Sequence, residues 1–155
     1  MKNAMAAIFL FAAVAAAADE TGPATRPASS QSAAVRFAWV DVFVDSGATP
    51  LAVYQFELKT LAGDAKIVGV ENGDVNSFQS PPYYDPAALQ GGRIIVGAFS
   101  RGAGDLPKGR SRVARLHLAI TGPAVPQYST RLVVAGAKDG SAIQANISFV
   151  EGASR

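Results

Sequence analysis

The chain has 155 residues, of which 49% are hydrophobic, which is enough for one domain with a single core. It contains no cysteine, and this excludes disulfides, thiolate catalysis and cysteine-based zinc sites. The formal charge is +2, and the basic residues are scattered apart from one concentration between residues 101 and 115, so nucleic-acid binding is not predicted.

The first 18 residues have the pattern of a secretory signal peptide. Lys2 supplies a short positive region, residues 4–14 are apolar, and Ala16-Ala17-Ala18 offers a cleavage site before Asp19. The apolar run is shorter than the ~20 residues that span a bilayer. We therefore expect an exported protein, periplasmic, at the cell surface or extracellular, with no membrane span after cleavage. Residues 19–33 are rich in Pro, Thr, Ser and Ala, which predicts a flexible leader before a single domain at 34–152.

The next 40 or so residues predict three strands. Residues 35–44 have two largely apolar faces, which indicates a strand that is central in its sheet or covered on both sides. Residues 51–58, LAVYQFEL, alternate with a period of two, so Tyr54, Phe56 and Leu58 should face one side. A turn at residues 62–64 follows, and the run at 65–70 is expected to be the partner of this strand.

Further strands and a long connection complete the expected fold. Residues 72–92 form the longest irregular segment, with one helical turn at Ala87–Leu89, and strands are predicted at 93–100 and 112–120. Residues 128–137 and 142–150 are expected to pair as a hairpin across Lys138-Asp139-Gly140, before a short tail at 153–155. The glycines and prolines fall between short apolar runs, which favours an all-β domain. We predict an immunoglobulin-like or jelly-roll β-sandwich of about eight or nine strands, with a core that includes Val40, Val42, Phe56, Leu58, Leu116 and Leu118.

The order of these strands resembles that of the cohesin and carbohydrate-binding-module group of β-sandwiches. The motifs that carry the resemblance are VDVFVDS at 40–46, LAVYQFEL at 51–58, GRSRVARLHL at 109–118 and the expected terminal hairpin at 128–150. The resemblance implies a cohesin-like sandwich that binds carbohydrate or a protein. Two features depart from it: the motif YDPAAL at 84–89 comes late, after an inserted strand and loop, and no dockerin or calcium loop is recognisable.

The candidate binding residues lie in two loops. Tyr83 and Tyr84 belong to a proline-rich segment where side chains are easily exposed, and sugar rings stack on flat aromatic surfaces. Arg101, Lys108 and Arg110 would add positive charge for an acidic glycan or an acidic protein patch. The alternative is that both tyrosines close one end of the sandwich and contribute only stability.

A second aromatic group, Phe37, Trp39 and Phe43, lies on one face of the first strand, where packing in the core or over a sheet is the more ordinary role.

The sequence contains no recognisable catalytic or metal-binding motif. His117 is the single histidine and is expected to face solvent, and there is no G-x-S-x-G motif. The loop aspartates are expected to form turns, although a calcium ion held among them is a second interpretation.

Two functions therefore remain open. The first is a secreted, non-enzymatic module that binds carbohydrate or an envelope or extracellular protein, without a cofactor. The second is a structural or assembly protein of the cell envelope.

The expected signal peptide predicts where the mature protein begins. The mature protein should begin at Asp19 or Ala18, because the small-residue cleavage motif ends there. Mass spectrometry of the exported protein measures this directly, and an intact Met1 on a cytoplasmic protein would contradict it.

Overall fold

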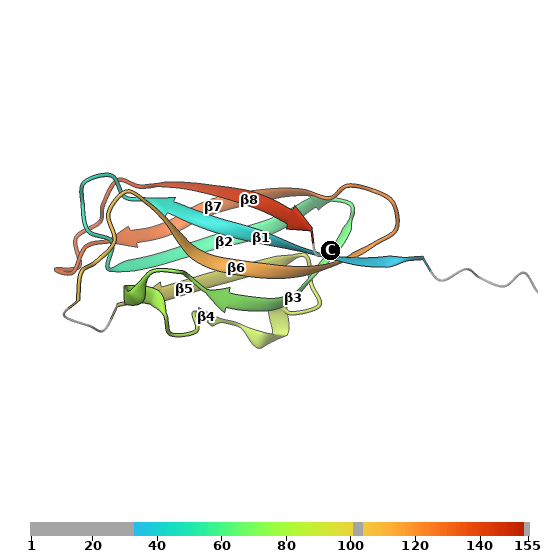
Figure 1. The fold of residues 1–155 in the computed structure, drawn as a ribbon, viewed down its shortest axis with the longest axis horizontal. Coiled ribbons are helices and arrows are strands. Elements are labelled where there is room, and N and C mark those ends of the chain that lie inside the picture. The colour runs from blue at the N-terminus through green and yellow to red at the C-terminus, as the bar shows by residue number, and fades with distance from the viewer. Residues whose placement is uncertain (1–32, 101–103, 154–155) are drawn as a thin grey trace, which may run out of the picture. The chain divides into compact units, whose positions relative to one another are not determined.

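A computed structural model describes residues 33–100 and 104–153, which fold into two antiparallel sheets packed face to face (Figure 1). Sheet A has the strand order β3-β6-β1-β8 and sheet B the order β4-β5-β2-β7. The predicted all-β sandwich is confirmed. The predicted signal peptide, the leader up to residue 32 and the last two residues lie outside the described residues. The strands are β1 (Val35–Asp45), β2 (Val53–Ala62), β3 (Asp64–Asn72), β4 (Tyr83–Tyr84), β5 (Arg93–Phe99), β6 (Arg110–Thr121), β7 (Gln127–Gly136) and β8 (Asn146–Ala153).

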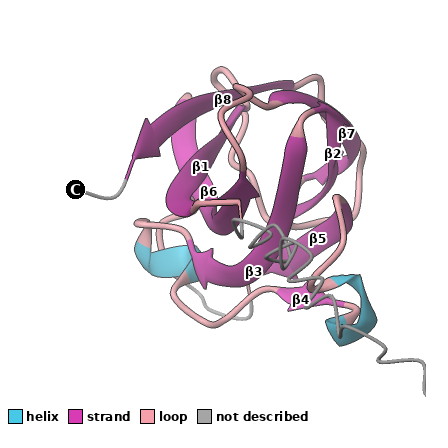
Figure 2. Cartoon of the chain, turned by 90° about the vertical axis from the view of Figure 1, so that its right-hand side faces the viewer, coloured by secondary structure: helices cyan, strands magenta, loops and turns pink. Residues whose placement is uncertain are grey.

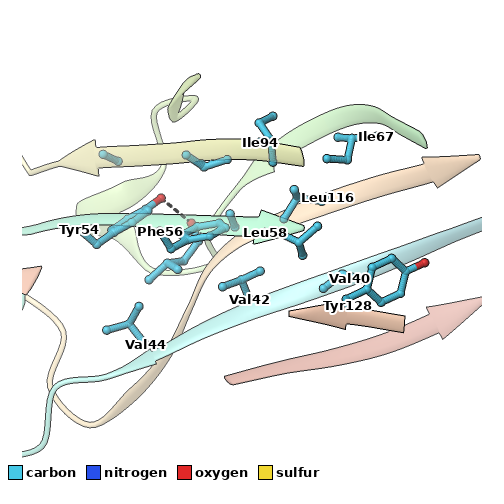
Figure 3. Packing of buried hydrophobic residues seen from close by; sticks show 14 of the residues in the cluster. Val40, Val42, Val44, Tyr54, Phe56, Leu58, Ile67, Ile94, Leu116 and Tyr128 are labelled. Carbon is cyan, nitrogen blue, oxygen red and sulfur yellow. Dashed lines mark hydrogen bonds between the residues drawn. The ribbon is translucent and has the colours of Figure 1, made fainter. Parts of the chain in front are cut away.

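The period-two pattern of the sequence sets which side chains enter the core. On β2, Tyr54, Phe56 and Leu58 are fully buried, while the residues between them face outward. β1 pairs with β6 on one side and β8 on the other, as two apolar faces predict for a central strand. Figure 2 looks roughly along the strands and shows the two sheets as separate layers. The buried side chains between them form the core (Figure 3). All six predicted core residues are among them: Val40, Val42, Phe56, Leu58, Leu116 and Leu118.

Two predicted pairings are wrong, for the same reason. β2 and β3 follow one another through Gly63, but β3 pairs with β6 in sheet A instead of with β2. Likewise β7 and β8 are joined by the predicted turn yet lie in different sheets, and only an isolated bridge, Gly136 to Ala142, begins a hairpin. In a sandwich, a tight turn can cross from one sheet to the other, and the alternation of apolar residues is the same in both cases. At Gly63 the crossing requires a φ of 80°.

The segment between β3 and β5 contains more structure than a loop. A short 3₁₀ helix, η1 (Asn76–Phe78), buries Phe78 against the core, and a second, η2 (Pro86–Ala88), forms the predicted helical turn. Between them Tyr83 and Tyr84 form β4, which extends the edge of sheet B by pairing with Gly97 and Val96 of β5. The two tyrosines are therefore held by a strand and point to opposite sides of it.

A hydrogen bond to a β-bulge in β6 links the two sheets. Val42 and Phe43 on β1 are paired with Ala114 and Arg112, which leaves Val113 as the extra residue, with its side chain fully buried. The hydroxyl of Tyr54 on β2 crosses the core and donates a hydrogen bond of 2.7 Å to the carbonyl oxygen of Val113 (Figure 3). Burial raises the pKa of the Tyr54 hydroxyl, so this group stays protonated and remains a donor.

Removing the Tyr54 hydroxyl should leave the Val113 carbonyl buried without its partner. We expect Tyr54→Phe to lower the free energy of unfolding by about 1–3 kcal/mol, the cost of an unsatisfied buried acceptor. Urea unfolding followed by circular dichroism measures it. Tyr128→Phe is the matched control, because Tyr128 is also in the core and no described residue accepts a hydrogen bond from its hydroxyl. Equal losses in the two variants would show that the bond to Val113 contributes nothing specific.

Candidate functional site

On the outer face of sheet B, residues that are paired across neighbouring strands form rows, and each row is one level of the sheet. Phe99 of β5 lies beside Val53 of β2; at the next level Tyr83, Gly97, Gln55 and Val134 follow one another across all four strands. Ile95, Glu57 and Arg131 form the third level, and Arg93, Lys59 and Ser129 the fourth. This face therefore changes from aromatic and apolar at one end to charged at the other.

A groove of about 580 Å³ lies on this face and is lined by residues of all four strands. Its depth comes from Gly97, which has no side chain and stands between Tyr83 on β4 and Gln55 on β2. A Cβ atom at residue 97 would lie 3.1 Å from the carbonyl oxygen of Tyr54 and would occupy the space between the two flanking side chains. The glycine thus permits both close strand packing and the open floor of the groove.

Two aromatic rings form the apolar end of the groove. The rings of Tyr83 and Phe99 are parallel to within 3°, and their centroids are 5.8 Å apart. Tyr83 is 58% exposed and Phe99 48% exposed, so both rings offer a large surface to solvent. Large exposed apolar groups that gather in one place are typical of binding surfaces.

The charged end of this face, where Arg93 also lines the groove, is organised around Glu57. Its Oε1 accepts a hydrogen bond of 2.6 Å from Nε of Arg93, and its Oε2 accepts one of 2.8 Å from Nη2 of Arg131. The hydrogen bonds from Arg131 and Arg93 hold the pKa of the Glu57 carboxyl below its ordinary value, so it is ionised at neutral pH. The carboxylate fixes both guanidinium groups on the outer face of the sheet.

The structure separates the residues predicted as one binding surface. Tyr83 lines the groove and is exposed, and Tyr84 also lines it but is half-buried and packs against the core. Lys108 is exposed in the loop before β6. Arg110 lies in sheet A with its guanidinium 3.5 Å above the Phe43 ring, so it is on the opposite face of the sandwich from Tyr83. Arg101 lies outside the described residues.

The aromatic residues of β1 lie on the outer face of sheet A and are neither core nor an open stripe. Trp39 lies against Gly152, where a Cβ would overlap the indole ring, and the guanidinium of Arg115 is 5.1 Å from the ring centroid. Phe43 lies beneath Arg110, and only Phe37 is largely exposed. Packing over the sheet is thus achieved by arginines rather than by another layer of the fold.

An ion-pair network fixes these arginines. Arg115 binds Asp41 in a bidentate pair, with Nε and Nη2 at 2.7 and 2.8 Å from the two carboxylate oxygens. Arg112 also reaches Asp41, at 3.5 Å, and its Nε bonds Asp74. The hydrogen bond from Arg115 lowers the pKa of Asp41, although burial opposes it.

The remaining polar residues have structural partners. Asp45, Asp85 and Asp139 each accept a backbone N–H two residues ahead, which confirms their predicted role in turns. His117 is partly exposed, as predicted, and its Nε2 lies 2.8 Å from Oε1 of Glu71. Within residues 33–100 and 104–153, no three His, Asp or Glu side chains are grouped in a way that would hold a metal ion.

Sequence reasoning missed Phe99, Gln55, Arg93 and Arg131, which share the outer face of sheet B with Tyr83. The alternation on β2 and β5 already indicated which residues face outward. It did not indicate that β2 and β5 are adjacent, because β3 lies between them in the chain. The signal that would have helped is Gly97, a glycine inside a strand flanked by outward-facing Ile95 and Phe99.

Comparison of the chain with protein-family models, curated proteins and solved structures finds no match. Across the part of the chain that is described, no helix has the length and apolar character needed to cross a bilayer.

The Asp41 network makes stability depend on pH in a defined direction. Because the pKa of Asp41 is lower in the folded state than its ordinary value of 3.8, its contribution is complete above that value and is lost as pH falls through the folded pKa. We expect Asp41→Asn to cost about 1.5–3 kcal/mol at pH 7, in the range of hydrogen bonds to charged groups. Unfolding measured from pH 7 to pH 2 should converge for the two proteins at the acid end. A constant difference at every pH would contradict this assignment.

Proposed function

We propose that the protein is an exported, non-enzymatic binding module and that the groove on the outer face of sheet B receives a carbohydrate. The observation that carries the proposal is the pair of parallel, exposed rings of Tyr83 and Phe99 beside the glycine floor at Gly97. The C–H faces of a sugar ring are apolar and flat, and they pack well on aromatic surfaces of this kind.

The other walls of the groove suit the polar rim of a sugar. Gln55 and Arg93 offer side-chain donors, and Gln55 and Asp85 offer acceptors, all within the same lining. Hydroxyl groups both donate and accept hydrogen bonds, so a ring seated on Tyr83 and Phe99 would find partners around its edge. A mainly apolar surface with a few convergent polar groups is the usual composition of a small-ligand site.

The size of the groove favours a saccharide over a protein partner. Its volume of about 580 Å³ falls within the range of small-molecule sites. A stable protein interface needs about 800 Å² from each partner, usually with an apolar centre. Here the apolar end is followed by Glu57 and Arg131 in the next row and by Arg93 and Lys59 in the row after it, so it does not extend into a broad apolar patch. The resemblance of the sequence motifs at 40–46, 51–58 and 109–118 to cohesins and carbohydrate-binding modules also favours this choice.

A glycan array probed with the protein, followed by calorimetry on the best oligosaccharide, tests the proposal. We expect the double variant Tyr83→Ala/Phe99→Ala to lose about tenfold or more in affinity, as for other hot-spot aromatics, with an unchanged melting temperature. Phe37→Ala is the matched control, because Phe37 is as exposed as Tyr83 but lies on sheet A.

Two results would contradict the proposal. One is the absence of binding to every glycan together with capture of a protein from the cell envelope, which would favour the assembly role. The other is an equal loss of affinity in Phe37→Ala, which would move the site to the other sheet.

A further inference from the structure

We propose that the carbohydrate is acidic, and that its carboxylate or sulfate groups bind Arg93, which lines the groove, and Arg131, which lies beyond the groove on the same face of sheet B. The inference rests on the proposed function and names the class of ligand for the same site. It is carried by the arrangement of the cations around Glu57, and by their distance from the aromatic end.

Three cationic side chains converge on this end from three strands. Arg93 and Lys59 are direct cross-strand neighbours on β5 and β2, and Arg131 of β7 is the neighbour of Glu57 on the other side. All three are exposed, whereas the side chain of Glu57 between the two arginines keeps only 14% of its surface exposed. The negative charge is therefore covered, and the positive charges face the solvent.

The charges at this end do not cancel. Glu57 is a single carboxylate facing Arg93, Arg131 and Lys59, and Asp85 is the carboxylate in the groove lining. Oδ1 of Asp85 accepts the Ala87 N–H at the start of η2, which is a structural task. Even with Asp85 counted, positive charge remains in excess.

A purely structural role would not need this arrangement. One arginine would suffice to pair Glu57, and exposed ion pairs contribute little to stability. Each guanidinium uses one N–H on Glu57, and an arginine has five. The remaining N–H groups are in the forked geometry that binds carboxylate or sulfate oxygens in pairs.

The separation of the two ends sets the size of the ligand. Gly97, level with Tyr83, lies four residues from Arg93 along β5, which is about 13 Å at the rise of an extended strand. This distance exceeds one sugar ring. A free monosaccharide or a small inorganic anion would reach one end alone, whereas a short acidic oligosaccharide would occupy both.

Pairs of probes that differ only in charge test the inference. Suitable pairs are oligogalacturonate and oligomannuronate with their carboxyl-reduced counterparts, and a sulfated galactan oligosaccharide with its desulfated form; the array result for the proposed function selects the pair. We expect the acidic member to bind at least tenfold more tightly at low salt, and this preference to shrink at high ionic strength. The preferred pair also decides between carboxylate and sulfate.

Single substitutions assign the preference to the two arginines. Arg93→Gln and Arg131→Gln each leave one arginine on Glu57, so the fold is preserved, and each should weaken the acidic probe by about three- to tenfold while leaving the neutral probe unchanged. Arg110→Gln is the control, since it removes the same charge from the opposite face of the sandwich. The salt dependence of the native protein gives a second measure that needs no variant.

Failure of this inference is distinguishable from failure of the proposed function. If the neutral probe binds as tightly as the acidic one, and still depends on Tyr83 and Phe99, the protein binds carbohydrate and the acidic assignment is wrong. The acidic assignment is also wrong if Arg110→Gln weakens the acidic probe as much as Arg131→Gln does. If no saccharide binds and an acidic peptide does, both proposals fall.

Discussion

The hydrogen bond from Tyr54 to the Val113 carbonyl fixes how the two sheets face each other. It satisfies the acceptor that the bulge in β6 turns toward the core, and it joins β2 of sheet B to β6 of sheet A. Because Tyr54 must point inward, Val53, Gln55 and Glu57 must point outward, and a slip of one residue would reverse both sets. The outer face of sheet B is thus determined from inside the core. The same bulge places Arg112 and Arg115 together on the outer face of sheet A, where both reach Asp41.

The two outer faces use similar residues in different ways. On sheet A, aromatic rings are covered by cations, since Arg110 lies over Phe43 and Arg115 over Trp39. On sheet B, the cations are held by Glu57 at one end and the exposed rings of Tyr83 and Phe99 lie at the other. On sheet B, the rings of Tyr83 and Phe99 and the side chains of Arg93 and Arg131 all keep exposed surface. On sheet A, arginines of the same sheet cover Phe43 and Trp39, and Phe37 keeps an exposed ring.

Sequence patterns predicted the strands and the core but not the order of strands in the sheets. Alternation in β2 and β6 identified Phe56, Leu58, Leu116 and Leu118 as buried, because burial depends on local periodicity. The pairing of β3 with β6 and of β8 with β1 depends on contacts between distant segments, and a turn such as the one at Gly63 has the same sequence whether it closes a hairpin or crosses between sheets. For the same reason Tyr83 was identified as a candidate while its neighbour Phe99 was not. Arg110 was grouped with Tyr83 although it lies on the other face.

Gly97 connects the packing of sheet B to its surface chemistry. A glycine inside a strand weakens it, because the unfolded chain gains freedom and no side chain packs on the neighbours. The close approach of the Tyr54 carbonyl explains why a glycine is present in spite of this cost, since an alanine Cβ at residue 97 would lie 3.1 Å from the carbonyl oxygen. The same absence of a side chain opens the floor between Tyr83 and Gln55. The backbone of β2, which the Tyr54 side chain fixes from inside the core, therefore favours a glycine at residue 97 of the neighbouring strand β5. The groove on the outer face thus follows from the same packing that stabilises the sandwich.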